Sequence, residues 1–335
     1  MKDEIILALE SSCDETSAAI LKNGTELLSN IISTQIKTHM EFGGVMPEIA
    51  SRLHLENIGY VLSSCFKEAK IDESEVTAVA VTGGPGLIGA LHVGVIAAKS
   101  LASYLKVPLI NVHHLAGHIY ANEFVKPFIF PLLAVVVSGG NSELVIMKDH
   151  LSYEIIGQTL DDAIGESLDK VARELGLPYP GGVSIDKLTQ GYKGDYIKLP
   201  KVKVKGYNLS YSGLKSKLIR DINKEKENGT LDEATILKYA YSVEKGFVDQ
   251  LLDKVFKAAD EYGVKQIVVG GGVSANTYLR SEVLKRGKGY DILIPPLKLT
   301  TDNAAMIAKA AHHMLEKNMV SPLTFAPKAS RELGE

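Results

Sequence analysis

The chain has 335 residues, of which 45% are hydrophobic and 23% charged, with 30 glycines, 12 prolines and no tryptophan. This ordinary composition excludes a disordered, collagen-like or coiled-coil protein, and the length suggests about two domains. The 37 basic and 40 acidic residues give a net charge of −3, which excludes a strongly basic nucleic-acid coat protein but leaves room for a local basic track.

Neither a secretory signal nor a membrane segment is expected. The N-terminal sequence MKDE precedes only a short apolar run. The longest weakly polar stretch, residues 76–98, is interrupted by GGPG, which a lipid-spanning helix would not contain. Cys13 and Cys65 cannot build a disulfide framework, so we expect a protein of the reducing cytoplasm with no membrane partner.

The chain begins with a predicted β-hairpin. Residues 4–22, EIILALESSCDETSAAILK, form an apolar run, a small polar turn and a second apolar run. Residues 132–148, LLAVVVSGGNSELVIMK, repeat that scheme. A hairpin near the start of each half suggests a duplicated two-lobe architecture.

Between the hairpins, strands and helices alternate. Strands are predicted at 75–81 and 107–112, and helices at 47–70, at 87–105 and from about His113. This alternation predicts a largely parallel α/β sheet.

The second half is predicted to be mainly helical. Helices are expected at 162–176, 211–223, 231–262 and about 301–317, with one buried strand at 266–269. No low-complexity linker separates the halves. We therefore expect lobes at 1–125 and 126–302, with a basic helical insertion at about 190–230 and the last helix, about 303–325, packing back on the first lobe.

The sharpest constellation of chemical groups is HHLAGH at residues 113–118. His114 and His118 are four residues apart, so a helix would place both imidazoles on one face, spaced to bind one divalent metal ion. A third ligand is needed, and Asp302, at a predicted helix start, is a good candidate. The alternative is that His114 merely caps or packs and that Asp302 is only an N-terminal helix residue.

The same spacing tests whether the protein could be a metalloprotease. A zincin needs His-Glu-x-x-His, in which the glutamate activates the metal-bound water. Here Leu115 follows His114 and Gly117 precedes His118, so the general base is missing from the helix. A metalloprotease is therefore disfavoured.

Three glycine-rich segments could cradle phosphates. Glycine lets backbone N–H groups approach an anion, and a following helix N-terminus adds favourable partial charge. None of the three matches a P-loop or a GxGxxG fingerprint, and each alone is more often a tight turn. Together, at strand ends, they favour a nucleotide between the lobes. The segments are Gly83–Gly86, Ser138–Gly140 and Gly270–Gly272.

Carboxylates gather on another predicted helix. Asp162, Glu166 and Asp169 fall on one helical face, which is normally solvated. Asp169 and the later Asp186 could instead accept hydrogen bonds from ribose hydroxyls.

Basic residues outnumber acidic ones between Lys193 and Lys226, and tyrosines are interleaved among them. The contrast with the acidic remainder suits contact with a nucleic-acid backbone, through residues such as Lys203, Lys205 and Lys215. The alternative is a solvated loop and helix.

Segments spread along the whole chain resemble the universal tRNA threonylcarbamoyl transferase family, formerly described as O-sialoglycoprotein endopeptidase. They occur in the family's order and are highly specific. They read ALESSCDETSAAI, GGVMPEIASRLH, TGGPGLIGALHVG, NVHHLAGH, VVVSGGNSEL, TLDDAIGESLDKVARELGLPYPGG, YNLSYSGLKS, VVGGGVSAN and TTDNAAMIA.

This resemblance implies an α/β fold of the two-lobed actin/Hsp70/sugar-kinase type, with duplicated sheet cores and an interlobe cleft. It also implies that His114, His118 and Asp302 bind the metal ion. The residues implied to contact the substrate are Val137, Ser138, Gly139, Gly140, Asn141, Asp169, Gly182, Asp186 and Asn276.

The chain departs from the family pattern at three positions. Some relatives, especially archaeal ones, carry a metal-binding tyrosine where this chain has Val136, so water or substrate must complete the metal shell. Many bacterial members have His in place of Asn141 and Glu in place of Ala116. These departures leave the side-chain contact of Asn141 open, and the absent tyrosine favours the bacterial type.

The implied reaction moves the threonylcarbamoyl group from its adenylate to N6 of adenosine 37 in tRNAs that read codons beginning with A. A metal ion could polarise the group, and the glycine loops and Asn276 would hold the AMP part. No general base is obvious; Asp14, Glu15 and the metal-bound water are candidates.

The resemblance also implies cofactors and partners. One divalent ion per subunit is expected, Fe²⁺ rather than Zn²⁺, and ATP or ADP can occupy the nucleotide cleft. Bacterial members act on tRNA together with a non-catalytic paralogue and a P-loop ATPase.

Two other functions fit the same fold. A small-molecule kinase needs a catalytic Asp over a sugar pocket and gives no reason for HxxxH. A non-enzymatic, Hsp70-like scaffold is expected to have a long peptide-binding C-terminal domain, and the absence of such a region from these 335 residues counts against it. Metal content and a tRNA modification assay discriminate between these functions and the transferase.

Overall fold

The computed structural model describes residues 3–335, which divide into two compact units. Unit 1 holds the residues up to Pro127 together with His150–Ser152 and Pro295–Glu335. Unit 2 holds Phe128–Asp149 and Tyr153–Ile294. The chain therefore leaves unit 1 after Pro127, touches it again briefly at His150–Ser152, and returns to it for good at Pro295.

Unit 1 is built on a five-stranded mixed sheet in the order β3-β2-β1-β4-β5. Short turns join β1, β2 and β3, which makes these strands antiparallel, whereas helical crossovers make β4 and β5 parallel to β1. The strands are β1 (Ile5–Glu10), β2 (Glu15–Lys22), β3 (Glu26–Thr34), β4 (Ala78–Gly84) and β5 (Leu109–His113).

Unit 2 repeats this topology in the order β8-β7-β6-β9-β10. The first three strands are again antiparallel neighbours, and the last two run parallel to β6. The strands are β6 (Leu132–Val137), β7 (Ser142–Met147), β8 (Glu154–Gln158), β9 (Gln266–Gly270) and β10 (Asp291–Leu293). The same order and directions in both sheets confirm the predicted duplication.

The prediction of a largely parallel sheet is wrong, because each hairpin is extended by a third antiparallel strand. These strands, β3 and β8, lie at sheet edges and are mostly half-exposed. Their sequences therefore lack the long apolar run by which a buried strand is recognised.

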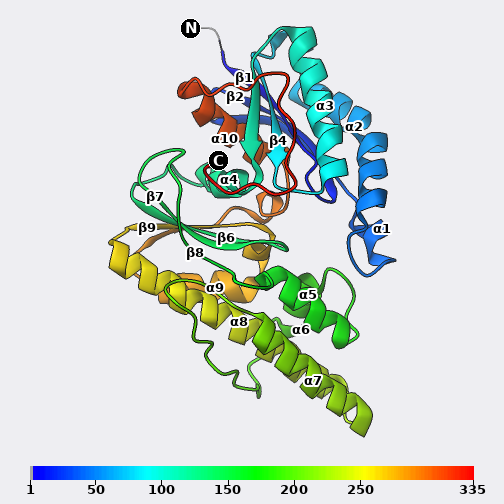
Figure 1. Ribbon diagram of the computed structural model, residues 1–335, viewed down its shortest axis with the longest axis vertical. Helices are drawn as coiled ribbons and strands as arrows, with labels where there is room; N and C mark the ends of the chain where they lie inside the picture. Colours follow the sequence, from blue (N-terminus) through cyan, green and yellow to red (C-terminus); the bar gives the residue numbers. More distant parts are fainter. Residues whose placement is uncertain (1–2) are drawn as a thin grey trace. The chain divides into compact units, whose positions relative to one another are not determined.

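Helices cover both faces of the sheet of unit 1 (Figure 1). α2 (Pro47–Ala69) and α3 (Ile88–Leu105) pack on one another and on the sheet, while α4 (His114–Tyr120) and α10 (Ala304–Glu316) form a second pair against it. Short helices fill the connections. These are α1 (Ile36–Met40), η1 (Glu73–Glu75), η2 (Ala121–Phe124) and η4 (Leu297–Leu299).

The return to unit 1 occurs at Pro295, earlier than the expected boundary at 302/303. The backbone N–H groups of Ala304 and Ala305 donate to the side chains of Ser17 and Asn30 on β2 and β3. These bonds place the start of α10, and the segment before it, in unit 1. Asp302 therefore belongs to unit 1 and not to the second lobe.

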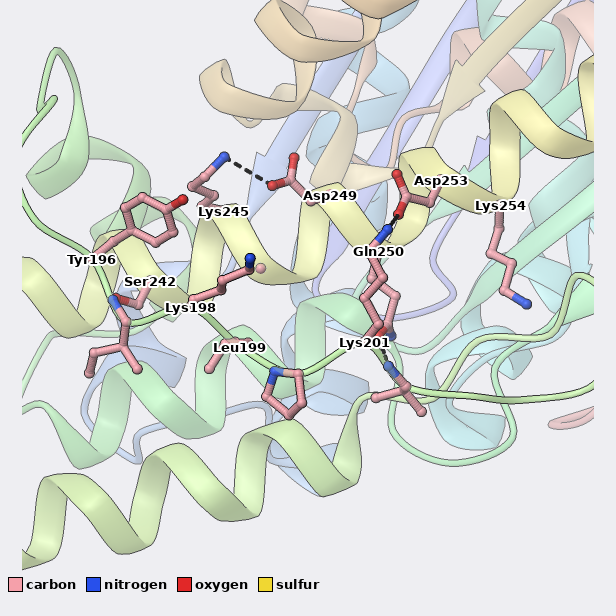
Figure 2. A pocket seen from close by; sticks show the side chains of 14 residues that line it. Tyr196, Lys198, Leu199, Lys201, Ser242, Lys245, Asp249, Gln250, Asp253 and Lys254 are labelled. Atoms are coloured by element: carbon pink, nitrogen blue, oxygen red, sulfur yellow. Dashed lines mark hydrogen bonds and ion pairs between the residues drawn. The ribbon is translucent and has the colours of Figure 1, made fainter.

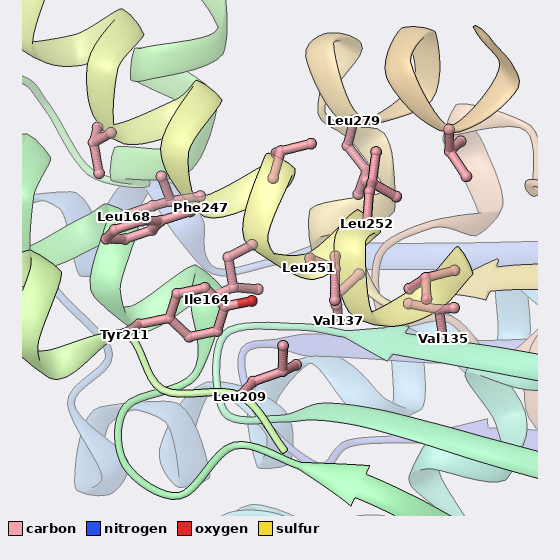
Figure 3. Packing of buried hydrophobic residues seen from close by; sticks show 14 of the residues in the cluster. Val135, Val137, Ile164, Leu168, Leu209, Tyr211, Phe247, Leu251, Leu252 and Leu279 are labelled. Carbon is pink, nitrogen blue, oxygen red and sulfur yellow. The ribbon is translucent and has the colours of Figure 1, made fainter. Parts of the chain in front are cut away.

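In unit 2, the long helix α8 (Glu233–Tyr262) packs on β6, with α9 (Thr277–Arg286) beside it. Figure 3 shows Phe247, Leu251 and Leu252 of α8 in a cluster with Val135 and Val137 of β6. The other helices are α5 (Ile164–Glu174), α6 (Gly181–Thr189), α7 (Ser212–Asn228) and η3 (Gly272–Ala275).

The predicted helical insertion at about 190–230 is only half helical. Residues 190–211 form no helix, and α7 begins at Ser212. The segment between α6 and α7 contains three glycines and one proline, and it alternates lysine with apolar residues, a pattern without helical period.

Within the described part of the chain, α3 alone is long and apolar enough to cross a membrane, with a mean hydropathy of 1.4 over Ile88–Leu105. It packs against β4 and α2. A helix that covers a sheet in a protein core has the same composition, so this feature is weak evidence for a membrane span.

Candidate functional site

Two histidines project from α4, which begins directly after β5. His113, the last residue of β5, caps the helix because its Nδ1 accepts a hydrogen bond from the Leu115 N–H. His114 and His118 are one turn apart and both are buried. Their rings meet edge to face with centroids 4.7 Å apart, so the expected arrangement on one helical face is present.

Asp302 lies beside both histidines. It precedes Asn303, whose side chain caps α10 by accepting a hydrogen bond from the Met306 N–H. Asp302 Oδ1 is 3.5 Å from His114 Nε2 and 3.2 Å from His118 Nε2. The structure therefore brings the three predicted metal ligands together within unit 1.

Glu10, at the end of β1, fixes the orientation of His114. Its Oε2 lies 3.1 Å from His114 Nδ1, and Ser12 Oγ lies 3.2 Å from the same nitrogen. Glu10 is fully buried and also accepts hydrogen bonds from the Ser12 N–H and the Thr82 hydroxyl. A histidine whose Nδ1 is held by a carboxylate presents Nε2 as the ligand atom, here toward Asp302.

Burial and charge oppose one another in this cluster. Burial alone would lower the pKa of His114, but the Asp302 and Glu10 carboxylates raise it to about 9. Burial would raise the pKa of Asp302, but His114 and His118 lower it to about 2. The two carboxylates thus make this buried place favourable for positive charge.

His118 tests whether the three residues fit a metal ion. Within residues 3–335 neither of its buried ring nitrogens makes a hydrogen bond, and Nε2 faces Asp302 without hydrogen-bond geometry. Nitrogen and oxygen ligands about 2.0–2.1 Å from one tetrahedral ion stand about 3.3 Å apart. The observed 3.2 and 3.5 Å agree with this spacing, so the residues fit one divalent ion.

A second cluster in unit 1, Glu123, His150 and His313, fits an ion-pair network better. His313 Nε2 lies 2.6 Å from Glu123 Oε2, as in a direct hydrogen bond, and His150 Nε2 is 3.8 Å from Oε1. The two rings stack at 3.8 Å. Lys309 Nζ, 3.6 Å from Glu123 Oε2, already supplies a cation, so a metal ion would meet an occupied carboxylate.

The candidate bases, Asp14 and Glu15, lie at the start of β2 and are nearly buried. Burial, followed by the charges of Asp14 and Asp302, raises the pKa of Glu15 well above its usual range. A raised pKa favours the protonated form of Glu15, and a protonated carboxyl cannot act as a base.

The first glycine-rich segment, Gly83–Gly86, is covered by the C-terminal part of the chain. The Lys328 N–H donates to Gly83 O at 2.9 Å, and the Gly86 N–H donates to Ala329 O at 3.1 Å. A Cβ at Gly84 would stand 2.2 Å from Lys328 O. Gly83–Gly86 is therefore a turn covered by the chain itself, which agrees with the tight-turn alternative for this segment rather than with a phosphate site.

The second segment, the turn between β6 and β7, is open. Gly139 and Gly140 have no atom within 4 Å of the place where a Cβ would lie. On its other side, the N–H groups of Gly165 and Glu166 donate to Ser138 O and Gly139 O at 3.3 and 3.2 Å, which joins the start of α5 to the turn. A Cβ at Gly165 would stand 2.6 Å from Ser138 O, so this approach requires glycine.

Helix α6 carries two of the expected substrate contacts, Gly182 and Asp186. Asp169 of α5 accepts a hydrogen bond from the Gly182 N–H at 3.0 Å, and burial raises the pKa of this carboxyl. Asp186 Oδ1 accepts from Thr277 N and Oγ1 at 2.8 and 2.6 Å, directly after Asn276. The structure thus places Asp169 beside Gly182, and Asp186 beside Asn276.

Glu244, a buried residue of α8, contacts both α6 and Asn276. Its Oε1 accepts a hydrogen bond from Asn276 Nδ2, and its Oε2 accepts one from Thr189 Oγ1, both at 2.6 Å. Glu244 is 2% exposed. One buried carboxylate therefore ties α6 and the start of α9 to α8.

Residues 195–206, the basic strap, run alongside α8 and are held by its side chains. A cavity of about 280 Å³ lies between the two (Figure 2). Lys201 and Lys245 at this cavity are paired with Asp253 and Asp249. The bonds that hold the strap run from Ile197 N to Ser242 Oγ, from Val202 N to Gln250 Oε1, and from Lys254 Nζ to Val204 O and Gly206 O.

The three lysines expected to contact tRNA differ in their surroundings. Lys203 and Lys205 are exposed on the basic strap. Lys215, on α7, forms an ion pair with Asp162 and its side chain is 14% exposed. The charge of Lys215 is thus already compensated within the protein.

Three residues of these sites were missed by the sequence analysis, namely Glu10, Ser12 and Glu244. Glu10 left a signal, because a carboxylate at the end of an otherwise apolar strand needs a buried partner. Glu244 left none that distinguishes it from the exposed acids of a long amphipathic helix.

Comparison with known proteins gives a consistent result. The family model described as tRNA N6-adenosine threonylcarbamoyltransferase matches residues 26–309. A curated relative of that name from Bacillus subtilis is 50% identical over 324 residues, covering 95% of this chain and 92% of the relative. A relative from Staphylococcus carnosus is 50% identical over 328 residues, covering 96% of this chain and 94% of the relative.

Among solved structures, (R)-2-hydroxyglutaryl-CoA dehydratase component A of Acidaminococcus fermentans is similar with a TM-score of 0.56 and 15% identity, covering 95% of this chain and 99% of that one. HypF of T. kodakarensis is similar with a TM-score of 0.66 and 15% identity; the match covers 94% of this chain but only 48% of that one. At this identity the likeness concerns the fold alone. With the duplicated sheets, it confirms the predicted actin/Hsp70/sugar-kinase-like fold.

Proposed function

Because the chain belongs to the tRNA N6-adenosine threonylcarbamoyltransferase family, we propose that it transfers the threonylcarbamoyl group from threonylcarbamoyl-AMP to N6 of adenosine 37 in tRNAs that read codons beginning with A. The observation that carries this proposal is 50% identity to a curated transferase over 95% of the chain. In the reaction, N6 forms a bond to the carbamoyl carbon, the bond from that carbon to the phosphate oxygen breaks, N6 loses a proton, and AMP leaves.

His114, His118 and Asp302 are proposed to hold one divalent ion, Fe²⁺ rather than Zn²⁺. Two imidazoles and a carboxylate suit either metal. When bound, the ion would supply a Lewis acid for the threonylcarbamoyl group. Glu10 supports this role, because it holds His114 Nδ1 and leaves Nε2 for the ion.

The residues of unit 2 are proposed to hold the threonylcarbamoyl-AMP. The open turn Val137–Asn141 offers backbone groups and space beside Gly139 and Gly140. Asp169 and Asp186 can accept hydrogen bonds from ribose hydroxyls, with Gly182 and Asn276 beside them. Holding the adenylate in one orientation supplies a large part of the rate enhancement, because the attacking exocyclic amine is a weak nucleophile.

The proton that leaves N6 needs an acceptor. The candidate side chains are Asp14 and Glu15, and burial counts against Glu15 because it raises the pKa of that carboxyl and so favours the protonated form.

The proposed partners are tRNA, a non-catalytic paralogue and a P-loop ATPase, and the proposed location is the cytoplasm. Lys203 and Lys205 on the basic strap are exposed, which supports contact with the tRNA backbone.

The test is a reconstituted modification assay with the chain, its proposed partners, threonine, bicarbonate, ATP, the adenylate-forming enzyme and unmodified tRNA. Modified adenosine is measured by mass spectrometry. We expect product from wild type and none from His114→Ala/His118→Ala. The matched control is His150→Ala/His313→Ala, which removes two histidines from the other cluster and should retain activity.

No product from wild type, with partners shown to be competent beside a known transferase, would contradict the proposal and favour the kinase or the scaffold. Equal loss in both double variants would contradict the assignment of the metal to His114, His118 and Asp302.

A further inference from the structure

A buried carboxylate on α8 has no direct part in the proposed reaction and yet reaches the proposed nucleotide site. Glu244 faces away from solvent, and its two oxygens are bonded to Thr189 of α6 and Asn276 at the start of α9. Burying a carboxylate costs free energy. The hydrogen bonds that Glu244 makes must offset this cost, and they indicate what the residue does.

The side-chain amide of Asn276 is held at both ends. Its Oδ1 accepts a hydrogen bond from the Leu279 N–H at 2.8 Å and caps α9. Because the oxygen must face this N–H, the amide nitrogen must face Glu244, where it donates at 2.6 Å. Glu244 takes one of the two amide hydrogens, and the second is the one that a bound nucleotide could receive.

The same carboxylate also holds α6 at its last turn. Thr189 Oγ1 donates to Glu244 Oε2, and one turn earlier Asp186 Oδ1 accepts two hydrogen bonds from Thr277. Asp186 and Asn276 therefore stand on two segments that meet at Glu244. Removal of this carboxylate would take one hydrogen bond from each segment at the same time.

Glu244 can fill this role in either protonation state. Burial raises its pKa to about 7, Asp186 adds to this effect, and the hydroxyl of Thr189 and the amide of Asn276 oppose it. When protonated, Glu244 can donate to Thr189 Oγ1, since that hydroxyl can turn its own hydrogen to Ile185 O at 3.0 Å. The bond from Asn276 to Oε1 remains in both states.

We propose that Glu244 is a positioning residue that holds Asn276 and α6 in the arrangement that binds the AMP moiety. This inference rests on the proposed function, because it concerns the same nucleotide site. In this role Glu244 acts through its hydrogen bonds to Asn276 and Thr189 and not by contact with the substrate.

The test compares Glu244→Ala with Glu244→Gln in the full-length protein. Glutamine keeps an oxygen for Asn276 and a donor for Thr189, whereas alanine leaves the buried amide of Asn276 without its acceptor. For Glu244→Ala we expect the Kd for AMP, measured by calorimetry, and the KM for threonylcarbamoyl-AMP to rise about tenfold, with kcat changed less than about threefold. Glu244→Gln should stay within about threefold of wild type in all three.

A buried variant of the same helix separates positioning from general loss of stability. Val255→Ala, about three turns further along α8, should lower Tm and leave the Kd for AMP unchanged. If Glu244→Ala does not fold, Glu244→Leu replaces it, because leucine fills the volume but accepts no hydrogen bond. Glu244→Ala and Glu244→Leu are both expected to bind AMP weakly at temperatures where they are folded.

Three results would overturn the inference. They are a Glu244→Ala or Glu244→Leu protein with the Kd for AMP of wild type, a Glu244→Gln protein as impaired as Glu244→Ala, and a Val255→Ala protein that loses AMP affinity equally. Wild type that binds AMP but transfers no threonylcarbamoyl group would contradict the proposed function, while the AMP measurements would still decide the role of Glu244. Wild type that does not bind AMP would overturn both.

Discussion

The charge on Glu10 is fully buried, and its partners are Ser12, Thr82 and His114. Because Glu10 occupies Nδ1 of His114, it leaves Nε2 as the nitrogen available to a metal ion. Glu10 thus orients a candidate ligand but is not itself a ligand. His118 has no equivalent support within residues 3–335, because neither of its ring nitrogens is hydrogen-bonded. Within the cluster, Glu10 therefore supports the orientation of His114.

We predict that Glu10→Gln lowers metal affinity by roughly 10–100-fold, because the amide is a weaker acceptor for His114 Nδ1–H. Competition with a chelator and metal analysis of the purified protein measure this. Glu123→Gln, in the second histidine cluster, is the matched control and should keep wild-type metal content. Unchanged affinity in Glu10→Gln would show that His114 needs no such support.

Glu244 makes stability depend on pH. Folding raises its pKa from 4.5 to about 7 through burial and Asp186. Between these values the unfolded chain has lost a proton that the folded chain keeps, so the free energy of unfolding falls as pH rises through the window and levels off above it. The nearby charged groups of α8 and α9, Lys245 and Arg280, are engaged with Tyr278 and Ser274 O.

We therefore predict that Glu244→Gln, which cannot ionise, gains stability relative to wild type by up to roughly 3 kcal/mol between pH 4.5 and 8. Urea unfolding at several pH values measures the difference. Curves for the two proteins that run parallel over this range would show that Glu244 has an ordinary pKa in the folded state.

At the scale of elements, glycines set how closely strands and helices approach the proposed nucleotide site. Gly271, between β9 and η3, has φ +93°, and a Cβ there would stand 2.2 Å from Val137 O of β6. Gly272, the next residue, has open space and an ordinary φ. A side chain would therefore be strained and would collide with backbone at Gly271, but neither would happen at Gly272.

We predict that Gly271→Ala destabilises the protein by more than about 1 kcal/mol, because alanine is strained at positive φ and collides with backbone. Gly272→Ala is the control and should change the free energy of unfolding by less than about 1 kcal/mol. Thermal unfolding and AMP binding are measured for both. Equal effects of the two substitutions would contradict the argument.

For the whole molecule, the repeated strand order shows that one topology builds both units. The repeat is not carried through to the end, because α10 follows β10 of unit 2 but packs on the sheet and on α4 of unit 1. This return brings Asp302 to the histidines. The cluster of His114, His118 and Asp302 is therefore a product of the chain's path and not of either half alone.

Long-range charge is also a property of the whole molecule. With a net charge of −3, the protein has no general attraction for RNA, so the proposed tRNA binding needs local groups such as Lys203 and Lys205.

We predict that Lys203→Glu/Lys205→Glu weakens tRNA binding and reduces the slope of log Kd against log salt by roughly 1–2, measured by filter binding. Lys226→Ala, which removes a lysine paired with Glu174, is the control and should leave the slope unchanged. An unchanged slope in the double variant would exclude the basic strap from the tRNA contact.

Local patterns in the sequence determined much of this protein. The two hairpins, the helices at 47–69 and 88–105, and the one-turn spacing of His114 and His118 follow from periods of two and of about 3.6 residues, which neighbouring residues alone express. The family motifs placed Asp302, Asp169, Asp186 and Asn276 as candidates before their positions in space were known.

Only the tertiary structure decided which of these residues meet and what supports them. The edge strands β3 and β8 and the extended basic strap lack a periodic apolar face, so their conformation depends on the elements that they contact. Glu10 and Glu244 matter because partners distant in the chain, Thr82 and Asn276, come within hydrogen-bond distance. Such contacts arise from the packing of whole elements, which no local period records.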